Sequence, residues 1–579
     1  MSEQQDIVLG IDLGTTFSAM AYVNSYGKPE IVTNADGHRT TPSVVHFYDT
    51  DGVVVGEEAV KMCVLEPEHV IRFIKRNMGE EDFTLEFFGR TYTPQEVSAL
   101  ILRKLKEDAE ELLGVDIKDA VITVPAYFNS AQRGATAEAG SIAGLNVLSI
   151  INEPTAAAIA YGVDKLGGER TLLVFDLGGG TFDVTVMKVE QSKLITLASD
   201  GNAELGGKDW DDRLVNHIAE QFLEQHGEDP RDESSPFQEL YERCLAAKIS
   251  LSSKERALVP VNHKGKRAGY SITREEFEAL SSDLVQQCVD TVDLVLDKAH
   301  ITWGMIDDVL LVGGATRMPM IRRALETASG KSPVDDINPD ECVSLGAALA
   351  GIFRHRPDHP ALTSARSQET RAPMTTASVS AGPRAAPTRT NPAAAAIGLA
   401  DGGSFATNLT SSATDSPPPQ RTKAQAPGPF DEGNVLPEVG SQPETPIYAL
   451  PGDVEILDAT THPLGIVVLD RNRQERVVEL IPEGTPLPHE FHGRFAYAYE
   501  NMRAVRVEVT EGHGSYRDEV TVIGKVELTG LPPRPRGTPI DVVYRYGVDQ
   551  ILSVQVIDVE TGQSREVRIR FAGGLDGPE

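Results

Sequence analysis

The chain has 579 residues, which is too long for one hydrophobic core and predicts two or three domains. Its formal net charge of −32 argues against nucleic-acid binding and against contact with anionic membrane surfaces. The four scattered cysteines, the polar first residues and the lack of any apolar run of about 18 residues predict a cytoplasmic protein without disulfides, signal peptide or membrane span.

Residues 5–355 alternate strand-like and helix-like segments. Residues 120–124 and 309–312 are continuous apolar runs, which is typical of strands that are buried on both faces. Residues 95–113 carry apolar side chains at helical spacing, with charged residues on the opposite face. This alternation predicts an α/β domain.

Two glycine-rich motifs each follow an apolar run: DLGTT at residues 12–16 and DLGGGTFD at residues 176–183. Glycines let backbone N–H groups approach a phosphate, and the threonines add hydroxyl donors. Asp12, Asp176 and Asp183 supply carboxylate oxygens of the kind that suits Mg²⁺ and its waters. A tight turn explains either loop alone equally well. Their recurrence after two strands predicts two related halves that close on one nucleotide.

A third glycine motif, LVGGATR at residues 311–317, also follows a strand-like run. Gly313 and Gly314 allow a close backbone approach, and Arg317 is suited to stacking on a base. The GKS at residues 330–332 resembles the end of a P-loop, but Leu325 stands where its first glycine belongs. No G-x-G-x-x-G follows a strand, which argues against a dinucleotide-binding fold.

Composition changes sharply at residues 356–449, which are dominated by Ala, Pro, Ser, Thr and Gly. Such a segment cannot bury enough apolar area to offset an ordering cost of about 1–2 kcal/mol per residue. We therefore predict a disordered linker, with a packed irregular domain as the alternative. Residues 450–572 return to apolar–polar alternation at period two, broken by turn signals, which predicts an antiparallel β-sandwich.

Together these motifs resemble the heat shock protein 70 family, the DnaK-type molecular chaperones. The resemblance rests on VITVPAYFN at 121–129, IINEPTAAA at 150–158 and NPDE at 338–341, and covers residues 5 to about 352 and about 453 to 572. It implies an α/β, actin/hexokinase-like two-lobed ATPase domain at residues 5–355. It also implies an all-β peptide-binding sandwich at residues 450–572, after the linker at 356–449.

The resemblance assigns four residues to ATP hydrolysis: Lys75, Glu153, Asp183 and Thr181. Lys75 positions the attacking water and offsets the charge of the γ-phosphate; alone it would be interpreted as an exposed lysine. Asp12 and Asp176 match the aspartates that hold Mg²⁺ through water and help to bind K⁺. Phosphoryl transfer depends mostly on positioning and charge neutralisation, which such a set of residues provides.

Further positions match the family's contacts to ATP or ADP and its interdomain relay. Ile249 and Arg317 flank the adenine, and Asp340 lies near the ribose. Pro125 and Arg133 match the relay. The full set of matched nucleotide contacts is Gly14, Thr15, Thr16, Phe17, Gly178, Gly179, Gly180, Lys248, Ser252, Gly313, Gly314, Arg317 and Asp340.

The chain departs from the family pattern at several positions. Leu245 replaces a ribose-contacting glutamate, which predicts weaker nucleotide affinity because a charge-assisted hydrogen bond contributes about 1.5–3 kcal/mol. Lys208 replaces a glutamate, and Ala315 a serine that is usual in one branch. The interval between Lys75 and Pro125 is shorter than in the family, which predicts a trimmed subdomain.

Six apolar residues of the C-terminal module match the family's peptide cleft: Ile466, Leu469, Phe495, Ala498, Val505 and Val507. Extended peptides bind such modules through backbone hydrogen bonds and side-chain pockets. Without the resemblance, the same six residues would be interpreted as ordinary core. The motif DVEILD at residues 453–458 resembles the family's interdomain linker, with Glu455 in place of a leucine. The chain stops soon after Phe571, so we expect no helical lid.

These features predict an ATP-driven, lidless chaperone whose partners are unfolded or extended polypeptides. A J-domain co-chaperone and a nucleotide exchange factor are further candidate partners. Ser149 replaces an arginine that meets the J-domain partner, and Glu455 replaces a leucine of the linker motif. We therefore expect the contact with J-domain proteins to be altered at these two positions. The alternative is a nucleotide-gated scaffold that holds one dedicated partner through its β-module. A sugar kinase of the same ATPase superfamily would leave the C-terminal match unexplained.

Overall fold

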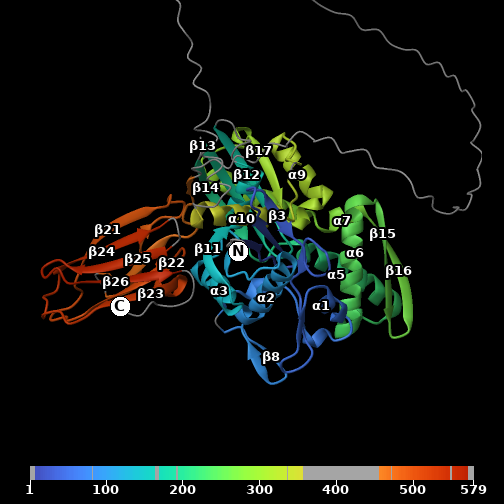
Figure 1. Ribbon diagram of the computed structural model, residues 1–579, viewed down its shortest axis with the longest axis horizontal. Coiled ribbons are helices and arrows are strands. Elements are labelled where there is room, and N and C mark those ends of the chain that lie inside the picture. Colours follow the sequence, from blue (N-terminus) through green and yellow to red (C-terminus); the bar gives the residue numbers. More distant parts are fainter. Residues whose placement is uncertain are drawn as a thin grey trace, which may run out of the picture. The chain divides into compact units, whose positions relative to one another are not determined.

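A computed structural model shows the fold and describes residues 7–80, 82–162, 169–190, 193–335, 337–356, 455–470, 473–547 and 551–570 (Figure 1). All of these belong to one compact unit that comprises Met1–Thr370 and Ile447–Glu579. Apart from Arg356, the predicted linker at residues 356–449 lies outside the described residues, so its disorder remains a prediction. We refer to residues 7–162 as the first lobe and to residues 169–335 as the second lobe.

The first lobe is built around a mixed sheet with the strand order β11-β10-β1-β2-β3, in which β4 also pairs with β2. β1 runs parallel to β10 and antiparallel to β2, so the DLGTT loop joins two neighbouring strands. The strands are β1 (Val8–Asp12), β2 (Phe17–Val23), β3 (Pro29–Val32), β4 (Thr41–Pro42), β10 (Asp119–Val124) and β11 (Asn146–Asn152). The strands predicted directly before the DLGTT motif and at residues 120–124 are confirmed as β1 and β10.

The second lobe repeats this plan in a sheet with the order β17-β12-β13-β14-β18. β12 runs parallel to β17 and antiparallel to β13, so the DLGGGTFD loop again joins neighbouring antiparallel strands. The strands are β12 (Arg170–Leu177), β13 (Phe182–Glu190), β14 (Lys193–Asn202), β17 (Asp308–Val312) and β18 (Glu455–Leu457). The edge strand β18 comes from the sequence beyond the predicted linker and pairs in parallel with β14.

Helices cover these sheets, and α2 shows how the local sequence defines one of them. α2 begins with a reciprocal capping box between Thr93 and Glu96, with Pro94 at its first position, and ends at Gly114 in the left-handed region (φ 67°). The predicted helix at 95–113 is thereby confirmed. The helices are α1 (Glu57–Met62), α2 (Pro94–Leu113), α3 (Ser130–Ile142), α4 (Glu153–Tyr161), α5 (Gly207–His226), α6 (Ser234–Ser253), α7 (Arg274–Leu280), α8 (Ser282–Lys298), α9 (Pro319–Ser329) and α10 (Cys342–His355).

Smaller elements complete the two lobes. The first lobe carries the sheet β6-β5-β7 and the hairpin β8–β9, and the second lobe carries the hairpin β15–β16. Their bounds are β5 (Val45–Phe47), β6 (Val53–Val55), β7 (Val70–Ile71), β8 (Leu85–Phe87), β9 (Arg90–Tyr92), β15 (Arg256–His263) and β16 (Lys266–Thr273). The 3₁₀ turns are η1 (Pro67–His69), η2 (Ile74–Asn77), η4 (Pro230–Asp232), η5 (Trp303–Met305) and η6 (Gly314–Arg317), with η7 (Arg517–Glu519) in the C-terminal module.

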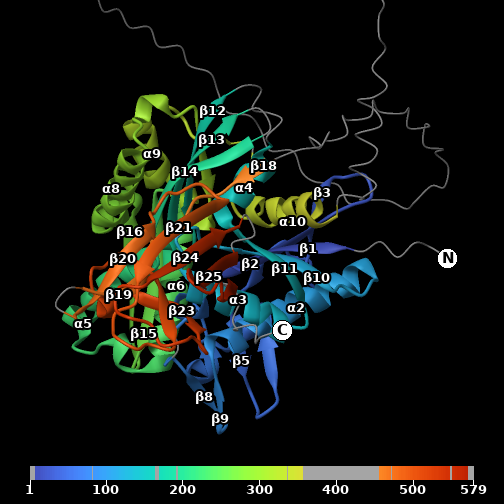
Figure 2. The same cartoon turned by 90° about the vertical axis from the view of Figure 1, so that its left-hand side faces the viewer.

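The lobes have separate cores that are joined by a shared central one. One core contains only first-lobe residues, another contains only second-lobe residues, and a third combines α4, α10 and strands of both sheets. Figure 2 shows α10 close to β1 and β3. At Gly346 a Cβ atom would lie 1.8 Å from the carbonyl oxygen of Ala156, so only glycine allows α10 to approach α4 this closely. This close contact between α10 and α4 is part of the core that joins the two lobes.

The C-terminal module consists of two four-stranded antiparallel sheets, with the orders β20-β19-β22-β23 and β21-β24-β25-β26. Its core includes the fully buried Tyr544, whose hydroxyl donates to the carbonyl of Gly465 at 2.9 Å. The strands are β19 (Leu464–Leu469), β20 (Glu475–Ile481), β21 (His489–Ala496), β22 (Val505–Glu511), β23 (Thr521–Leu528), β24 (Pro539–Tyr546), β25 (Ile551–Asp558) and β26 (Ser564–Arg570). No helix in the described part of the chain is long and apolar enough to cross a membrane.

Candidate nucleotide site and peptide module

The two predicted phosphate loops pack directly against each other. A Cβ atom on Gly179 would lie 2.1 Å from Oγ1 of Thr16, and one on Gly180 would lie 2.3 Å from Cγ2 of Thr15. No side chain fits in these gaps, so both glycines are required for the loops to meet. The structure therefore brings together the two motifs that the sequence places about 160 residues apart.

The third glycine motif lies beside the second loop. Gly313 has φ 82°, in the left-handed region, and its N–H donates to the carbonyl of Pro339 at 3.0 Å. A Cβ atom there would lie 2.4 Å from the carbonyl oxygen of Leu177 and 2.8 Å from Oδ1 of Asp176. The end of β17 is thus held against the end of β12, next to a predicted metal-binding carboxylate.

Lys75 and Glu153 form a buried ion pair between these loops and the central core. Lys75 Nζ donates to Glu153 Oε1 at 2.7 Å, and the residues are 4% and 6% exposed. Lys75 lies in the 3₁₀ turn η2, and Glu153 is the first residue of α4. The interpretation of Lys75 as an exposed surface lysine is therefore wrong.

The carboxylates around this pair carry an excess of negative charge. Burial, followed by the charge of Glu153, raises the pKa of Asp12 to about 7, although Asp12 keeps some accessible surface. Burial likewise raises the pKa of Asp176 and of Asp183 well above the ordinary range, and Glu153 adds to both shifts. For Lys75, burial lowers the pKa, but the attraction of Glu153 and Asp12 outweighs it and raises the pKa overall. One lysine therefore faces four carboxyl groups.

This charge imbalance fits a bound cation. Both carboxylate oxygens of Asp183 are buried without a hydrogen bond of standard geometry, although the backbones of Ala126 and Tyr127 lie near them. Buried carboxylates are normally paired or bound to metals. Within the described residues, no three His, Cys, Asp or Glu side chains are grouped for direct metal coordination. The residues present thus fit Mg²⁺ by their charge and oxygen chemistry.

At the predicted nucleoside end, Lys248 on α6 is held by second-lobe residues. Its Nζ donates to the carbonyl of Gly207 at 2.7 Å and pairs with Asp211 at 2.9 Å. Arg317 pairs with Asp340 at 2.5 Å, so the structure joins two residues that the resemblance assigns to adenine and ribose. Ile249 and Phe17 are exposed, while Ser252, Leu245 and Ala315 are partly buried.

The predicted relay residues lie next to the Lys75–Glu153 pair. Arg133 on α3 donates to the carbonyls of Phe128 and Ala126, both at 2.8 Å, and to Oδ1 of Asn152 at 2.7 Å. Asn152 directly precedes Glu153, and Pro125 directly precedes Ala126. Arg133 therefore ties the loop after β10 to the start of α4.

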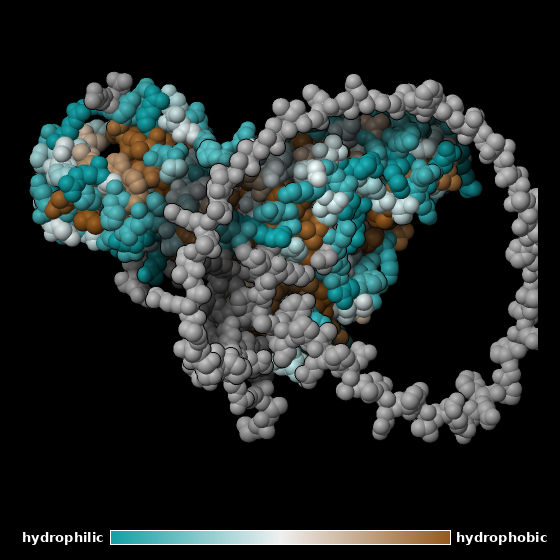
Figure 3. All heavy atoms as spheres, turned by 90° about the horizontal axis from the view of Figure 1, so that it is seen from above, coloured by the Kyte–Doolittle hydropathy of each residue, from teal (hydrophilic) through white to brown (hydrophobic). Residues whose placement is uncertain are grey.

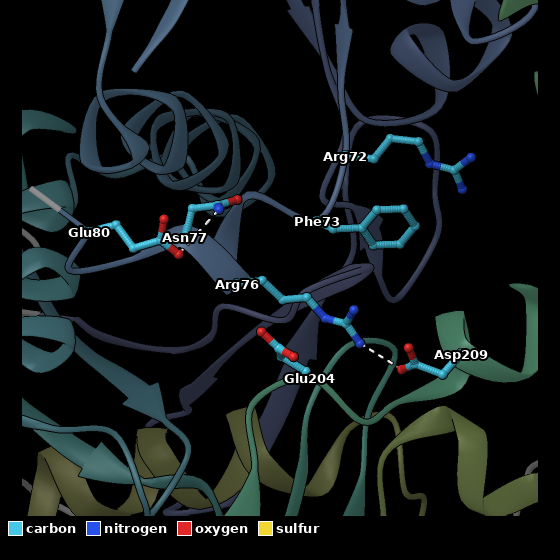
Figure 4. A pocket seen from close by; sticks show the side chains of 7 residues that line it. All are labelled: Arg72, Phe73, Arg76, Asn77, Glu80, Glu204 and Asp209. Atoms are coloured by element: carbon cyan, nitrogen blue, oxygen red, sulfur yellow. Dashed lines mark hydrogen bonds and ion pairs between the residues drawn. The ribbon is translucent and has the colours of Figure 1, made fainter. Parts of the chain in front are cut away.

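Two neighbours of Lys75, Arg72 and Arg76, also reach the second lobe, and they were not identified from sequence. Arg76 donates from Nε to the carbonyl of Gly180 at 2.8 Å and from Nη2 to Asp209 at 2.7 Å (Figure 4). Arg72 pairs with Glu242 on α6 at 2.6 Å. They share a pocket of roughly 330 Å³ with Phe73, Asn77, Glu80 and Glu204. Their only signal in the sequence is that they lie close to Lys75. That position does not predict which distant residues they contact.

The segment that resembles the interdomain linker contacts both lobes. β18 pairs with β14, and Thr155 on α4 donates to Oδ1 of Asp458 at 3.1 Å. The backbone N–H of Ser130 donates to Oε2 of Glu511, and a ring nitrogen of His462 lies 2.8 Å from the carbonyl oxygen of Tyr127. Ser149, at the predicted J-domain position, lies 3.2 Å from Nε2 of His355.

The six predicted peptide-cleft residues divide into two groups. Ile466, Val505 and Val507 are buried in the core of the β-sandwich. Leu469 is 37% exposed, while Phe495 and Ala498 are partly buried. Figure 3 shows apolar side chains at the surface of this module, at the left of the view. The peptide-binding role of all six residues stays a prediction.

Comparisons with known proteins identify the family. A family model described as "Hsp70 protein" matches residues 8–86, 81–359 and 450–579. The chain belongs to the Hsp70 family. Chaperone protein DnaK of Thermotoga petrophila and that of Thermotoga maritima are each 36% identical to it over 575 residues, covering 98% of this chain and 81% of the relative. Chaperone protein DnaK of Halobacterium salinarum is 35% identical over 580 residues, covering 98% of this chain and 76% of the relative.

Membership in the Hsp70 family confirms the predicted resemblance and implies an actin-like ATPase domain followed by a β-sandwich. The two related sheets of the lobes and the paired C-terminal sheets agree with that plan. The family match extends over both parts, which the sugar-kinase interpretation does not explain. The roles of individual residues remain predictions that rest on position and geometry.

Proposed function

We propose that this Hsp70-family protein is an ATP-dependent molecular chaperone that hydrolyses ATP to regulate its binding of extended apolar peptide segments. The observation that carries the proposal is the buried Lys75–Glu153 pair, which lies near the carboxylates of two glycine loops packed against each other. The family match of the chain also includes the β-sandwich. We assign ATP hydrolysis to residues 5–355, linkage to residues 356–449 and peptide binding to residues 450–572.

The loops provide the phosphate site. Backbone N–H groups of Gly14 and of residues 178–180, with the hydroxyls of Thr15, Thr16 and Thr181, offer donors to phosphate oxygens. Asp12 and Asp176 would hold Mg²⁺, with K⁺ as a further cation. When bound, Mg²⁺ neutralises charge on the phosphate oxygens. The packing of Gly179 and Gly180 against Thr15 and Thr16 supports this arrangement, because it fixes the two donor sets relative to each other.

Lys75 and the carboxylates act on the attacking water. The raised pKa of Lys75 keeps its ammonium group charged, so it offsets the charge that develops on the transferred phosphoryl group. Its hydrogen bond to Glu153 fixes the direction of the ammonium group. The buried carboxylate of Asp183 is available to orient the water, and the raised pKa of Asp183 makes its ionised form a better proton acceptor. Hydrolysis thus depends on charges that the closed arrangement of the two lobes holds in position.

The peptide module is coupled to this site through β18. Docking of β18 on β14 places Asp458 against Thr155, two residues after Glu153 on α4. We propose that ATP favours this docked arrangement and loosens peptide binding, and that hydrolysis reverses it. Such coupling is reciprocal, so peptide must alter ATP affinity by the same factor. J-domain proteins and nucleotide exchange factors are proposed partners, with the J-domain contact altered at Ser149 and Glu455.

The direct test uses the full chain with a fluorescent extended apolar peptide. We expect peptide anisotropy to fall when ATP and Mg²⁺ are added and to recover as ATP is consumed. Steady-state ATP hydrolysis is measured in parallel, with and without peptide and with J-proteins of the same genome. Bound peptide that ignores ATP would overturn the coupling. A pull-down that recovers one stoichiometric folded partner, rather than many unfolded clients, would favour the scaffold alternative, which the named relatives do not support.

A further inference from the structure

Phe73, two residues before Lys75, has a backbone conformation that is unfavourable for its residue type. Its φ of 62° and ψ of 19° place it in the left-handed region, where the Cβ atom of an L-residue is crowded. Non-glycine residues persist in this region when surrounding contacts enforce it, and such residues cluster at functional sites. The contacts of Phe73 therefore bear on the position of Lys75.

Those contacts come largely from the second lobe. Two cations lie over the ring of Phe73, with the guanidinium carbon of Arg72 5.1 Å and Nζ of Lys208 5.7 Å from its centroid. The rings of Phe73 and of Tyr241 on α6 meet edge to face, with centroids 6.4 Å apart. Arg72 also lies 4.9 Å from the Tyr241 ring. Cation–π and edge-to-face contacts of this kind are attractive.

The chain crosses between two cores at this point. Phe73 packs against the core of the second lobe, whereas the next residue, Ile74, is buried in the core of the first lobe. Lys75 follows immediately and turns inward to Glu153. Arg76 then returns to the second lobe, at Gly180 and Asp209 (Figure 4). The direction of Lys75 is thus set between two residues that are anchored on the opposite lobe.

We propose that Phe73 is a positioning residue for Lys75. Its ring, held by Tyr241 and Lys208 of the second lobe, enforces the left-handed backbone that directs Lys75 into the site. Separation of the lobes would remove these contacts and allow the backbone to relax, so Lys75 is in place only when the lobes are closed. The inference rests on the proposed ATPase function and adds a residue that makes hydrolysis depend on lobe closure.

The chain offers a matched control in Phe88. It is also a phenylalanine in the left-handed region, with φ 51°, at the turn between β8 and β9. Its ring is tilted by 36° against that of His69 in the same lobe, with centroids 4.9 Å apart, and the residue is 44% exposed. It shares the residue type and the backbone strain but has none of the Phe73 contacts to the second lobe.

The test compares Phe73→Ala, Phe73→Tyr and Phe88→Ala in the full chain. Single-turnover ATP hydrolysis, equilibrium ATP affinity and thermal midpoint are measured for each. We expect Phe73→Ala to slow hydrolysis roughly ten- to a hundred-fold, because a small misplacement of a catalytic group has effects of that size. ATP affinity should change less than about threefold. Phe73→Tyr retains the ring and should restore most of the rate, and Phe88→Ala should hydrolyse like the wild type.

Tyr241 provides a second, independent route. Tyr241→Leu removes the ring that Phe73 contacts, whereas Tyr241→Phe removes only the hydroxyl that donates to Asp211 at 3.3 Å. We expect Tyr241→Leu to slow hydrolysis in the same way, Tyr241→Phe to keep the rate, and the double variant Phe73→Ala/Tyr241→Leu to be little slower than either single variant. If Phe73→Ala fails to fold, the comparison of Tyr241→Leu with Tyr241→Phe still tests whether Phe73 positions Lys75.

Two outcomes overturn the inference. One is a wild-type single-turnover rate in Phe73→Ala and Tyr241→Leu. The other is a loss of rate that only follows a loss of ATP affinity or of thermal stability. A wild-type protein that hydrolyses no ATP would instead refute the proposed function itself, so the two failures are distinguishable.

Discussion

In the lobes the predicted site residues converge, whereas in the β-sandwich the predicted cleft residues divide between core and surface. Glycines 179 and 180 leave no space for a Cβ atom, and the carboxylates around Lys75 are buried without enough positive charge. Ile466, Val505 and Val507 are instead packed as ordinary core residues. Burying several carboxylates with one lysine costs free energy, and a bound cation and phosphate would offset that cost. Apolar side chains, in contrast, suit a packed core and a ligand cleft equally well, so they do not distinguish the two.

Removal of the central charge should have the largest effect. We expect Lys75→Ala to lower single-turnover ATP hydrolysis by roughly 10²–10³-fold, the usual loss when one preorganised electrostatic group is removed. The matched control is Lys61→Ala, which removes an exposed lysine paired with Glu58 and should hydrolyse normally. A Lys75→Ala protein with the wild-type rate would show that the ammonium group of Lys75, although surrounded by carboxylates, does not contribute to ATP hydrolysis.

The two groups of cleft residues can be separated by stability and peptide affinity. We expect Ile466→Ala to lower the free energy of unfolding by about 2 kcal/mol or more, because it leaves a cavity in a packed core. Leu469→Ala should change stability by less than about 0.5 kcal/mol, since that side chain is partly exposed. Urea unfolding and peptide anisotropy report the two quantities.

If Leu469→Ala weakens peptide binding at unchanged stability, the exposed group belongs to the cleft. If only Ile466→Ala affects peptide, and only through stability, the six residues are core and the family assignment fails at this module. Val478, another exposed apolar residue of the sandwich that no prediction includes, supplies the control through Val478→Ala.

Crowding of the phosphate loops predicts a smaller but specific effect. In Gly180→Ala the new methyl would lie 2.3 Å from Cγ2 of Thr15, so the loops must separate. We expect ATP affinity to fall about tenfold, because the donors on the two loops no longer meet the same phosphates. Gly304→Ala, whose nearest neighbour would lie 3.9 Å away, controls for the substitution itself. Unchanged affinity in Gly180→Ala, measured by calorimetry, would contradict the loop assignment.

Features that depend on local sequence could be predicted, whereas contacts between distant segments could not. The loops at Gly14 and Gly179, the strands before them and the capped helix after Thr93 all follow from local rules, and the structure contains them. The contacts of Phe73 and Arg76 to the second lobe depend on how two distant segments pack, and no local pattern encodes them. The same limit applies to Ile466, because alternation at period two places a residue on an inner face without showing what covers it.

The raised pKa of Asp12 predicts a pH dependence that distinguishes the charged site from the apolar one. Its pKa of about 7 in the free protein lies above the ordinary carboxyl value, so the folded state holds a proton that the unfolded chain has lost. The stability of the free protein should therefore decline as pH rises from about 4 through 7 and level off above. Binding of Mg²⁺ and ATP requires the ionised form, so their affinity should rise over the same interval, by at most about tenfold per pH unit for one proton.

Calorimetry at pH 6, 7 and 8 in buffers of different ionisation enthalpy would detect the released proton. Asp12→Asn should bind Mg²⁺ and ATP more weakly and lose most of the pH dependence, although the raised pKa values of Asp176 and Asp183 leave a remainder. Peptide binding by the sandwich involves no such group and should stay flat over this range. An ATP affinity that is equally flat would mean that the carboxylates are ionised before the ligand arrives, and that some other feature of the fold compensates their charge.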